Sequence, residues 1–198
     1  MPGNYRVLQA GQLDKGISFY RYSLDLPKKV TADSPAVDVM TDLKRVTAVT
    51  VTPDTAIDQA LQKMIHAEVR MLLVADWHLE VVGVITARDI LGEKPVHFSS
   101  SERLPRDQIL VEHIMTPQDE IQVLQMEDVL HARVGDVIQT LREAGRQHAL
   151  VVEPDGPGKN QIIRGIFSTT QIGRQLGIEI EPSGAKQSFS ELEAALNH

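Results

Sequence analysis

The sequence predicts an α/β fold made of two copies of one small unit, packed as a pseudo-twofold pair. Three short motifs predict it, because each occurs twice in the same order: an opening motif at 39–41 and 114–117, a central motif at 69–74 and 146–151, and a closing motif at 83–90 and 165–172. The copies lie 75 residues apart at the opening motif, 77 at the central motif and 82 at the closing motif. Since internal repetition defines the folding unit, we expect paired binding clefts between the copies.

The first copy reads in the order strand–helix–strand–strand–helix. Val and Thr residues at 47–52 are typical of a short strand. A helix with one apolar face follows, because apolar residues recur at helical spacing: Ile57, Ala60, Leu61, Met64 and Ile65. The apolar run 71–75 predicts a buried strand, 81–86 predicts its return partner, and a short helix should begin at about Ala87.

The second copy repeats this order. We expect strands at 121–126, 149–152 and 162–167, and a helix whose buried face carries Val134, Val137, Ile138 and Leu141. The Pro- and Gly-rich loop at 153–160 accounts for most of the larger offset at the closing motif.

Together with the segments outside the repeats, the chain divides into five parts. They are an N-terminal arm (1–35), the first repeat (36–96), an exposed linker (97–110), the second repeat (111–177) and a C-terminal tail (178–198). Aromatic residues and two prolines in the arm favour extended structure over a helix. Ser190–Glu193 has the Ser-x-x-Glu form of a capping box, which predicts a short terminal helix.

The composition excludes several classes of function. A net charge of −7 and 4% aromatic residues argue against binding to nucleic acid, which needs basic side chains and stacking platforms. The chain contains no cysteine, and its seven histidines lack the close spacing of a zinc site, so we expect no metal. No apolar run approaches about 18 residues, so we expect no membrane span and a cytoplasmic protein.

The motifs resemble those of the CBS domain family, as the tandem pair known as a Bateman module. The resemblance rests on Val37-Asp38-Val39-Met40-Thr41, on the central motif and on the closing Gly-x-Ile-Thr-x-x-Asp-Ile of the first copy, and it covers about residues 36–177. It implies a CBS pair with no catalytic domain beside it, often assembled as a disc-shaped homodimer. It also implies an adenosine-bearing ligand (AMP, ADP, ATP, S-adenosylmethionine, sometimes NAD) and a regulatory role toward a protein target that the sequence does not identify.

The first closing motif carries the residues for such a ligand. Asp89 stands three residues after Thr86, at a strand-to-helix junction, where a carboxylate can accept hydrogen bonds from both ribose hydroxyls. Thr86 adds a hydroxyl beside backbone N–H groups that suit a phosphate, Arg88 adds charge, and Val84 an apolar surface for adenine. In the alternative interpretation Asp89 caps its helix, Thr86 is a turn residue and Arg88 is solvated.

The family resemblance places the other wall of this site in the second copy. It implies Thr116 and Ile121 near adenine and Gln147 and His148 near phosphate. His148 interrupts an apolar run, so a structural histidine is the alternative.

The second closing motif departs from the pattern, because Gln171 stands where Asp89 stands in the first. Ser168 can still serve a phosphate, and the resemblance implies a further wall of Thr41, Lys44, Val46, Arg70 and Met71. Arg70 and Lys44 suit an anion, although Arg70 is equally suited to a salt bridge at a dimer surface. We therefore expect one good site per chain and a second that is weak, empty or retuned.

Three functions compete on this basis. The leading one is a homodimeric sensor that binds an adenosine ligand and modulates a partner. The alternative is a ligand-independent dimeric scaffold with a degenerate pocket, which Gln171 favours. An enzyme acting on a nucleotide ranks last, because the sequence holds no Walker loop, no nucleophile elbow and no nucleophile–base pair.

Overall fold

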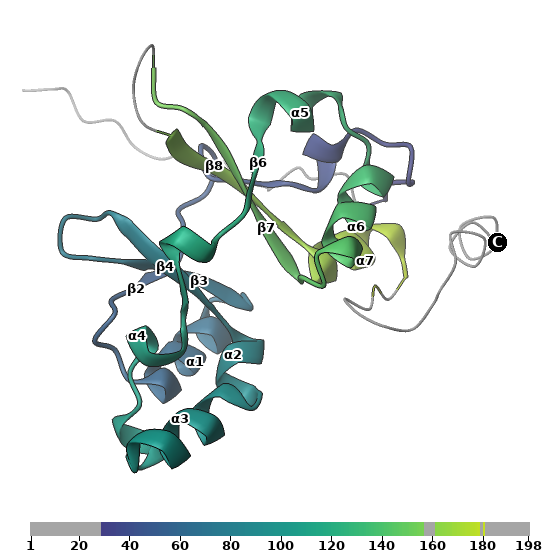
Figure 1. Ribbon diagram of the computed structural model, residues 1–198. Helices are drawn as coiled ribbons and strands as arrows, with labels where there is room; N and C mark the ends of the chain where they lie inside the picture. Colours follow the sequence, from purple (N-terminus) through teal and green to yellow (C-terminus); the bar gives the residue numbers. More distant parts are fainter. Residues whose placement is uncertain (1–28, 157–160, 179, 181–198) are drawn as a thin grey trace, which may run out of the picture.

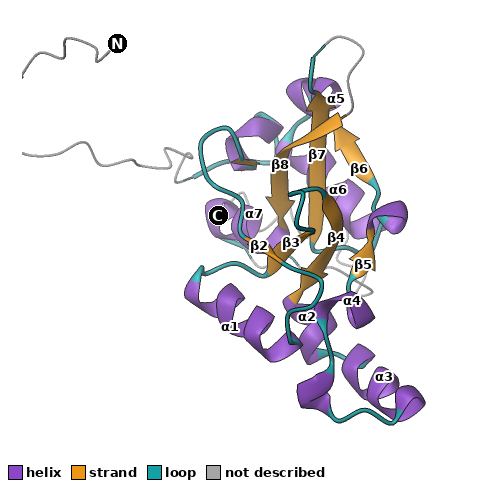
Figure 2. Ribbon diagram, turned by 90° about the vertical axis from the view of Figure 1, so that its left-hand side faces the viewer, coloured by secondary structure: helices purple, strands orange, loops and turns teal. Residues whose placement is uncertain are grey.

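The computed structural model describes residues 29–156, 161–178 and 180. Most of the N-terminal arm, the tip of the loop at 157–160 and the capping box predicted at 190–193 lie outside the described residues. The described chain forms two units, each built on a four-stranded sheet (Figure 1). The strands of both sheets meet in the middle of the molecule, with α1, α2 and α3 at one end (Figure 2). This architecture confirms the predicted α/β class.

The first unit has the sheet order β2-β3-β4-β5. Its elements are β2 (Thr50–Val51), α1 (Ile57–His66), β3 (Met71–Ala75), β4 (Val81–Thr86), α2 (Ala87–Leu91), α3 (Lys94–Glu102), η2 (Arg106–Gln108), α4 (Val111–Ile114), β5 (Thr116–Pro117) and η3 (Gln118–Glu120). Strands β3 and β4 have the predicted bounds, and α2 begins at the predicted residue. Strand β2 is shorter than the predicted 47–52.

The second unit has the order β1-β8-β7-β6. Its elements are η1 (Ala36–Val39), β1 (Thr41–Asp42), β6 (Val123–Gln125), α5 (Met126–His131), α6 (Val134–Glu143), β7 (His148–Pro154), β8 (Gln161–Ser168) and α7 (Thr169–Leu176). All four apolar residues predicted for the buried face of α6 are buried. Helix α5 is an addition that the repeat pattern does not predict.

The segment expected to be an exposed linker (97–110) is helical at 97–102, where it forms the end of α3, and at 106–108, which is η2. Its serines stabilise the turns by donating to backbone carbonyls: Ser100 Oγ to Val96 O (2.8 Å) and Ser99 Oγ to Leu104 O (2.6 Å). The helix remains largely exposed, as the composition predicts.

The opening segment of each repeat crosses into the other unit. Strand β1 pairs antiparallel with β8, with Thr41 opposite Ile166, and β5 pairs antiparallel with β4, with Thr116 opposite Val84. The cores cross in the same way. Ala36, Val39 and Met40 are buried in the core of the second unit, and Ile109, Val111 and Ile114 in that of the first. Each unit is therefore completed by the other repeat.

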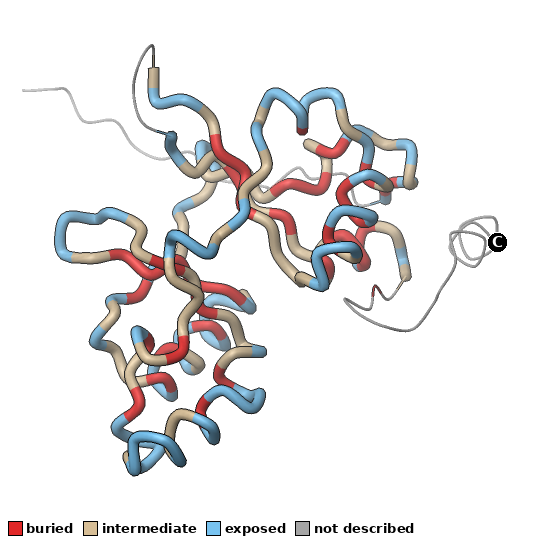
Figure 3. Tube along the Cα trace, viewed as in Figure 1, coloured by how far each residue is buried: buried red, intermediate tan, exposed pale blue. Residues whose placement is uncertain are grey.

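A smaller apolar cluster joins the two sheets. Its buried members are Met71 and Leu73 of β3 and Leu150 of β7. Buried residues follow the strands and the inner sides of the helices in both units (Figure 3). The two sheets therefore pack against each other, which places the ends of β3, β4, β7 and β8 on either side of the junction.

Both closing motifs begin with a glycine because the crossed segment approaches the strand closely there. A Cβ atom on Gly83 would lie 2.7 Å from the Thr116 carbonyl oxygen, and one on Gly165 would lie 2.5 Å from the Met40 sulfur. A backbone carbonyl held in a strand pair cannot move aside, whereas a methionine side chain can change rotamer.

We therefore expect Gly83→Ala to destabilise the fold by about 1–3 kcal/mol, the usual range for overpacking, and Gly165→Ala to destabilise it less. Urea unfolding of the two variants beside the wild type measures the difference. Equal losses at both positions would contradict the assignment of the larger effect to the Thr116 carbonyl.

Candidate functional site

A cavity of about 340 Å³ opens between the two units on the side where β4 ends and β7 begins. All eight residues predicted for the first site line it: Val84, Thr86, Arg88, Asp89, Thr116, Ile121, Gln147 and His148. The crossed strand β5 brings Thr116 opposite Val84. The second unit supplies His148, the first residue of β7, and Gln147 directly before it. Residues from both repeats therefore surround one space, as the resemblance implies.

Asp89 is held in place by neighbours in its own unit. Its Oδ2 accepts hydrogen bonds from Thr86 N (2.8 Å) and Thr86 Oγ1 (2.6 Å), and its Oδ1 pairs with Lys94 Nζ (2.7 Å). Asp89 N in turn donates to Thr86 Oγ1 (3.2 Å), which completes a capping box at the start of α2. The capping interpretation is thus confirmed. Because a carboxylate has about four acceptor positions, Oδ1 retains one for a further donor in the cavity.

Three of the backbone N–H groups at the start of α2, where a phosphate was predicted, are already bonded within the protein. Thr86 N bonds Asp89, Ala87 N donates to Arg70 O (2.9 Å) and Asp89 N bonds Thr86. The Asp89 carboxylate is itself an anion at this helix start. Positive charge in the cavity comes instead from Arg88 and Arg146.

His148 lies between this cavity and a second one, and its ring lines both. Burial is the main cause that lowers its pKa from 6.5 to about 4; the nearby Arg70 guanidinium lowers it further and Asp89 opposes the shift. The ring is therefore neutral at pH 7. Its Nδ1 is buried and has no hydrogen-bond partner among the described residues, so His148 is not the satisfied structural histidine of the alternative interpretation.

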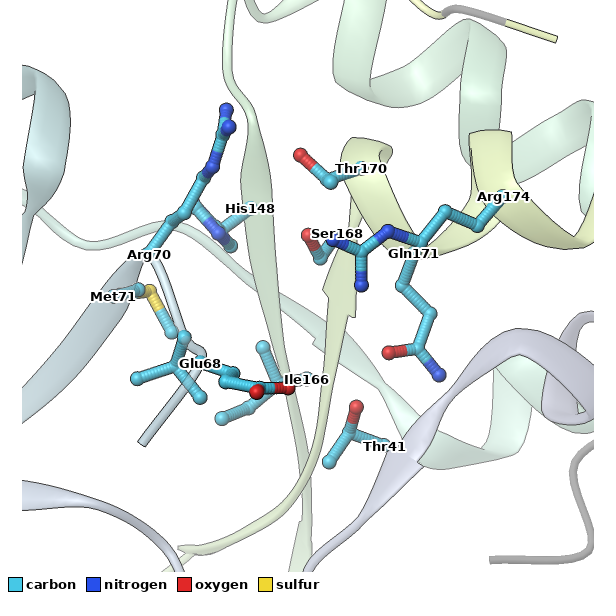
Figure 4. A pocket seen from close by; sticks show the side chains of 11 residues that line it. Thr41, Glu68, Arg70, Met71, His148, Ile166, Ser168, Thr170, Gln171 and Arg174 are labelled. Atoms are coloured by element: carbon cyan, nitrogen blue, oxygen red, sulfur yellow. The ribbon is translucent and has the colours of Figure 1, made fainter. Parts of the chain in front are cut away.

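The second cavity has a volume of about 140 Å³ and lies on the other side of His148 and Met71 (Figure 4). Five of the seven residues predicted for the second site line it: Thr41, Arg70, Met71, Ser168 and Gln171. Lys44 and Val46 do not. Lys44 Nζ pairs with Glu153 Oε1 (2.5 Å), and Val46 N donates to Asp42 O (3.1 Å), so the turn after β1 keeps both residues away.

The residues 36–95 match the family model of the CBS domain. The chain thus contains a match to the CBS domain over its first repeat. Its second repeat lies outside the matched residues but has the same strand–helix–strand–strand–helix order, with α5 inserted after its first strand.

Several solved structures are similar to this chain. An uncharacterised conserved protein from Pyrococcus horikoshii is 26% identical, with 72% of this chain and 92% of that chain covered and a TM-score of 0.51. CBSX2 in complex with AMP, a CBS-pair protein of Arabidopsis thaliana, is 24% identical (71% and 94% covered, TM-score 0.49). A CBS-domain-containing protein from Agrobacterium tumefaciens is 22% identical (73% and 93% covered, TM-score 0.49). No curated protein matches the chain significantly.

Sequence reasoning missed several residues of the two cavities. The first cavity is also lined by Met71, Glu120, Gln122, Gly145, Arg146 and Leu150, and the second by Glu68, Val69, His148, Ile166, Thr170 and Arg174. Two of these residues could have been predicted from their positions in the sequence. Arg146 directly precedes Gln147, and Arg174 lies one helical turn after Gln171.

Within residues 29–156, 161–178 and 180, the chain brings together no group of three His, Asp or Glu side chains that could hold a metal ion. In the same described part of the chain, no helix combines the length and the hydropathy that a membrane crossing requires.

Proposed function

We propose that this CBS pair is a regulatory sensor that binds an adenosine-containing ligand (AMP, ADP, ATP or S-adenosylmethionine) in the first cavity and thereby modulates a protein partner. The observation that carries the proposal is the convergence of eight residues, predicted from both repeats, around one cavity of about 340 Å³. That volume falls within the range of roughly 300–1,000 Å³ in which small-molecule sites lie.

The cavity lining matches the three parts of such a ligand. Val84, Ile121 and Leu150 supply apolar surface for an adenine ring. Asp89 Oδ1 has an acceptor position left for a ribose hydroxyl. Arg88 and Arg146 have no ion-pair partner among the described residues, so their guanidinium groups are available to phosphate oxygens or to a ligand carboxylate.

Binding in this position links to regulation because the ligand touches both units. Asp89 belongs to the first unit, whereas Gln147 and His148 belong to the second. A ligand shifts an equilibrium between two arrangements only if it binds one of them more tightly. Contacts from both sides of the junction supply that dependence, since moving one unit against the other separates them.

The test is calorimetric titration with AMP, ADP, ATP, NAD and S-adenosylmethionine. We expect saturable binding of at least one of them, weakened about tenfold to a hundredfold by Asp89→Asn, because a hydrogen bond to a charged group contributes about 1.5–3 kcal/mol. The matched control is Asp136→Asn. Asp136 Oδ2 likewise accepts a hydrogen bond from a helix-start N–H, that of Arg133 (2.8 Å), but it lines neither cavity.

An equal loss of affinity in the Asp136 control would mean that helix capping, and not ligand contact, sets the affinity. If none of the five ligands produces heat, the sensor proposal is wrong and the alternative, a ligand-independent dimeric scaffold, is favoured. An exposed apolar surface is the observation that favours that alternative: Ile65 of α1 and Leu91 of α2 are 59% and 68% exposed.

We infer a homodimer through this same face, since α1 packs against α2 and both carry exposed apolar side chains. Gel filtration with light scattering measures the state. The cytoplasmic location, the absence of catalysis and the absence of a bound metal stay predictions of the sequence, and the regulated partner is a protein target outside this chain.

A further inference from the structure

Lys94 is the first residue of α3, but its side chain contacts two other helices. Its Nζ lies 2.7 Å from Asp89 Oδ1 of α2 and donates to the Ile114 carbonyl oxygen of α4 (3.0 Å). A cation is disfavoured in the first turn of its own helix, because the positive end of the helix dipole lies there. The charge of Lys94 therefore serves α2 and α4 rather than α3.

Both contacts of Lys94 lead to the wall of the first cavity. Asp89 lines that cavity from the closing motif of the first repeat. Ile114 is the last residue of α4 and lies two residues before Thr116, which lines the same cavity from the opening segment of the second repeat. Lys94 itself lines neither cavity. Its ammonium group thus joins, from behind, two segments of one wall that come from different repeats.

The helix that carries Lys94 is fixed against its neighbours. The Phe98 ring of α3 stacks on the His113 ring of α4, with 4.5 Å between the ring centroids and 15° between the ring planes. Pro95, next to Lys94, is buried. Helices α2, α3 and α4 pack together at one end of the molecule (Figure 2). The direction from which Lys94 reaches the wall is therefore set by packing.

Lys94 completes the support of the Asp89 carboxylate. Thr86 holds Oδ2, and Lys94 holds Oδ1, the oxygen with an acceptor position left for a ligand. The Asp89 side chain is only 14% exposed, so little water replaces a lost partner. The Ile114 carbonyl oxygen at the end of α4 has no partner within its own helix, and Lys94 supplies one. Groups that are held before binding lose less freedom when a ligand arrives.

We propose that Lys94 is a positioning residue for an adenosine ligand in the first cavity. It holds the carboxylate that accepts from the ribose and the segment that carries Thr116 beside the adenine in the relation that the ligand requires. Lys94 acts through these groups and not by touching the ligand. This role rests on the function proposed above, and it adds a residue to the site that the cavity lining does not include.

The experiment is a double-mutant cycle of Lys94→Met and Asp89→Asn, read by calorimetric titration with AMP and with S-adenosylmethionine. The two compounds share adenine and ribose but carry opposite charges on the remaining group. We expect Lys94→Met to weaken the binding of both by a similar factor of about ten. In the Asp89→Asn background the same change should cost about threefold or less, because the main group that Lys94 positions is gone.

Lys44→Met is the matched control. Lys44 Nζ likewise pairs with a partly buried carboxylate, Glu153 Oε1 (2.5 Å), but it lines neither cavity. Its variant should bind both compounds as the wild type does. An equal loss in Lys44→Met would mean that removal of any such lysine weakens binding, and the positioning role would be wrong.

Three other results overturn the role of Lys94. Tighter binding by Lys94→Met would mean that the ligand competes with Lys94 for Oδ1. A loss confined to AMP would mean that Lys94 acts by its charge on the phosphate. Equal losses in both backgrounds would mean that Lys94 does not act through Asp89. If the wild type binds neither compound, the role also falls, and titration with ADP, ATP and NAD then decides separately whether the sensor function falls with it.

Discussion

A His148→Met variant should lose most of the sensitivity to acid that the wild-type protein shows on going from about pH 6.5 to pH 4. The pKa of His148 is lowered from 6.5 to about 4 in the folded protein, by burial first and by Arg70 second, against the opposing charge of Asp89. Between these two values the unfolded chain binds a proton that the folded protein does not. The contribution of His148 to stability is therefore full above pH 6.5 and is lost as the pH drops toward 4.

The expected loss is roughly 3 kcal/mol, because each unit of pKa corresponds to about 1.4 kcal/mol. Methionine is the chosen replacement because Met71 occupies the equivalent position in the first repeat: Met71 lies opposite Thr86 in its sheet, and His148 lies opposite Ser168. The free energy of unfolding in urea at pH 7 and at pH 4.5 measures the effect. The control is His131→Met, which changes an exposed histidine on α5. It should keep the wild-type difference in the free energy of unfolding between pH 7 and pH 4.5. If His148→Met keeps the wild-type difference between the two pH values, the acid sensitivity does not come from His148.

The second large effect is expected for Arg164→Met. Arg164 pairs with Asp42 through Nη1 and through Nη2 (2.9 Å to Oδ2), and its Nε lies 3.2 Å from Glu153 Oε2. The three side chains are only 14%, 18% and 21% exposed. Burial alone raises the pKa of Asp42, yet the hydrogen bonds and charges around it, those of Arg164 above all, lower the pKa overall. Removing the cation leaves these two poorly hydrated carboxylates with only the more exposed Lys44 and Arg45 as cationic partners among the described residues.

Losing one member of a buried ion pair typically costs about 3–5 kcal/mol, and we expect Arg164→Met to approach the lower end because some solvent reaches the group. The control is Arg133→Met. Its pair with Asp33 (2.7 Å) has side chains that are 66% and 83% exposed, and such surface pairs contribute about 1 kcal/mol or less. Urea unfolding at pH 7 compares the two variants. Similar losses in both would show that Arg164 holds β1 no more firmly than a surface pair would.

The sequence predicted β3, β4 and the buried face of α6 well, because long apolar patterns determine these elements locally. It did not predict that β1 and β5 cross between units. Each of these strands has two residues, too few to show a period, and their partners are chosen by contacts such as Thr41 with Ile166 that are remote along the chain. Helix α5 was missed because nothing in the first repeat corresponds to it.

The lining of the first cavity was predictable where a motif places a residue close to the terminus of a strand, as with Asp89, Thr116 and Gln147. The lining was not predictable where a long side chain can adopt several orientations. Lys44 lies three residues after Thr41, which lines the second cavity, but its ammonium group pairs with Glu153 outside that cavity. The capping role of Asp89 was visible from its spacing to Thr86, whereas the contact of Lys94 with its other oxygen depends on how α2 and α3 pack.

The crossed opening segments also order the events of folding during synthesis. Within the first unit, Thr116 must find Val84, 32 residues earlier, so that sheet can close soon after the ribosome releases β5. The second unit must wait for Ile166 to pair with Thr41, a separation of 125 residues, while the apolar side chains of η1 have no sheet to cover. Pairings of such long range are slow to form and leave apolar surface open to aggregation in the meantime. A nascent chain stalled before β8 is therefore the form in which this protein most needs a chaperone.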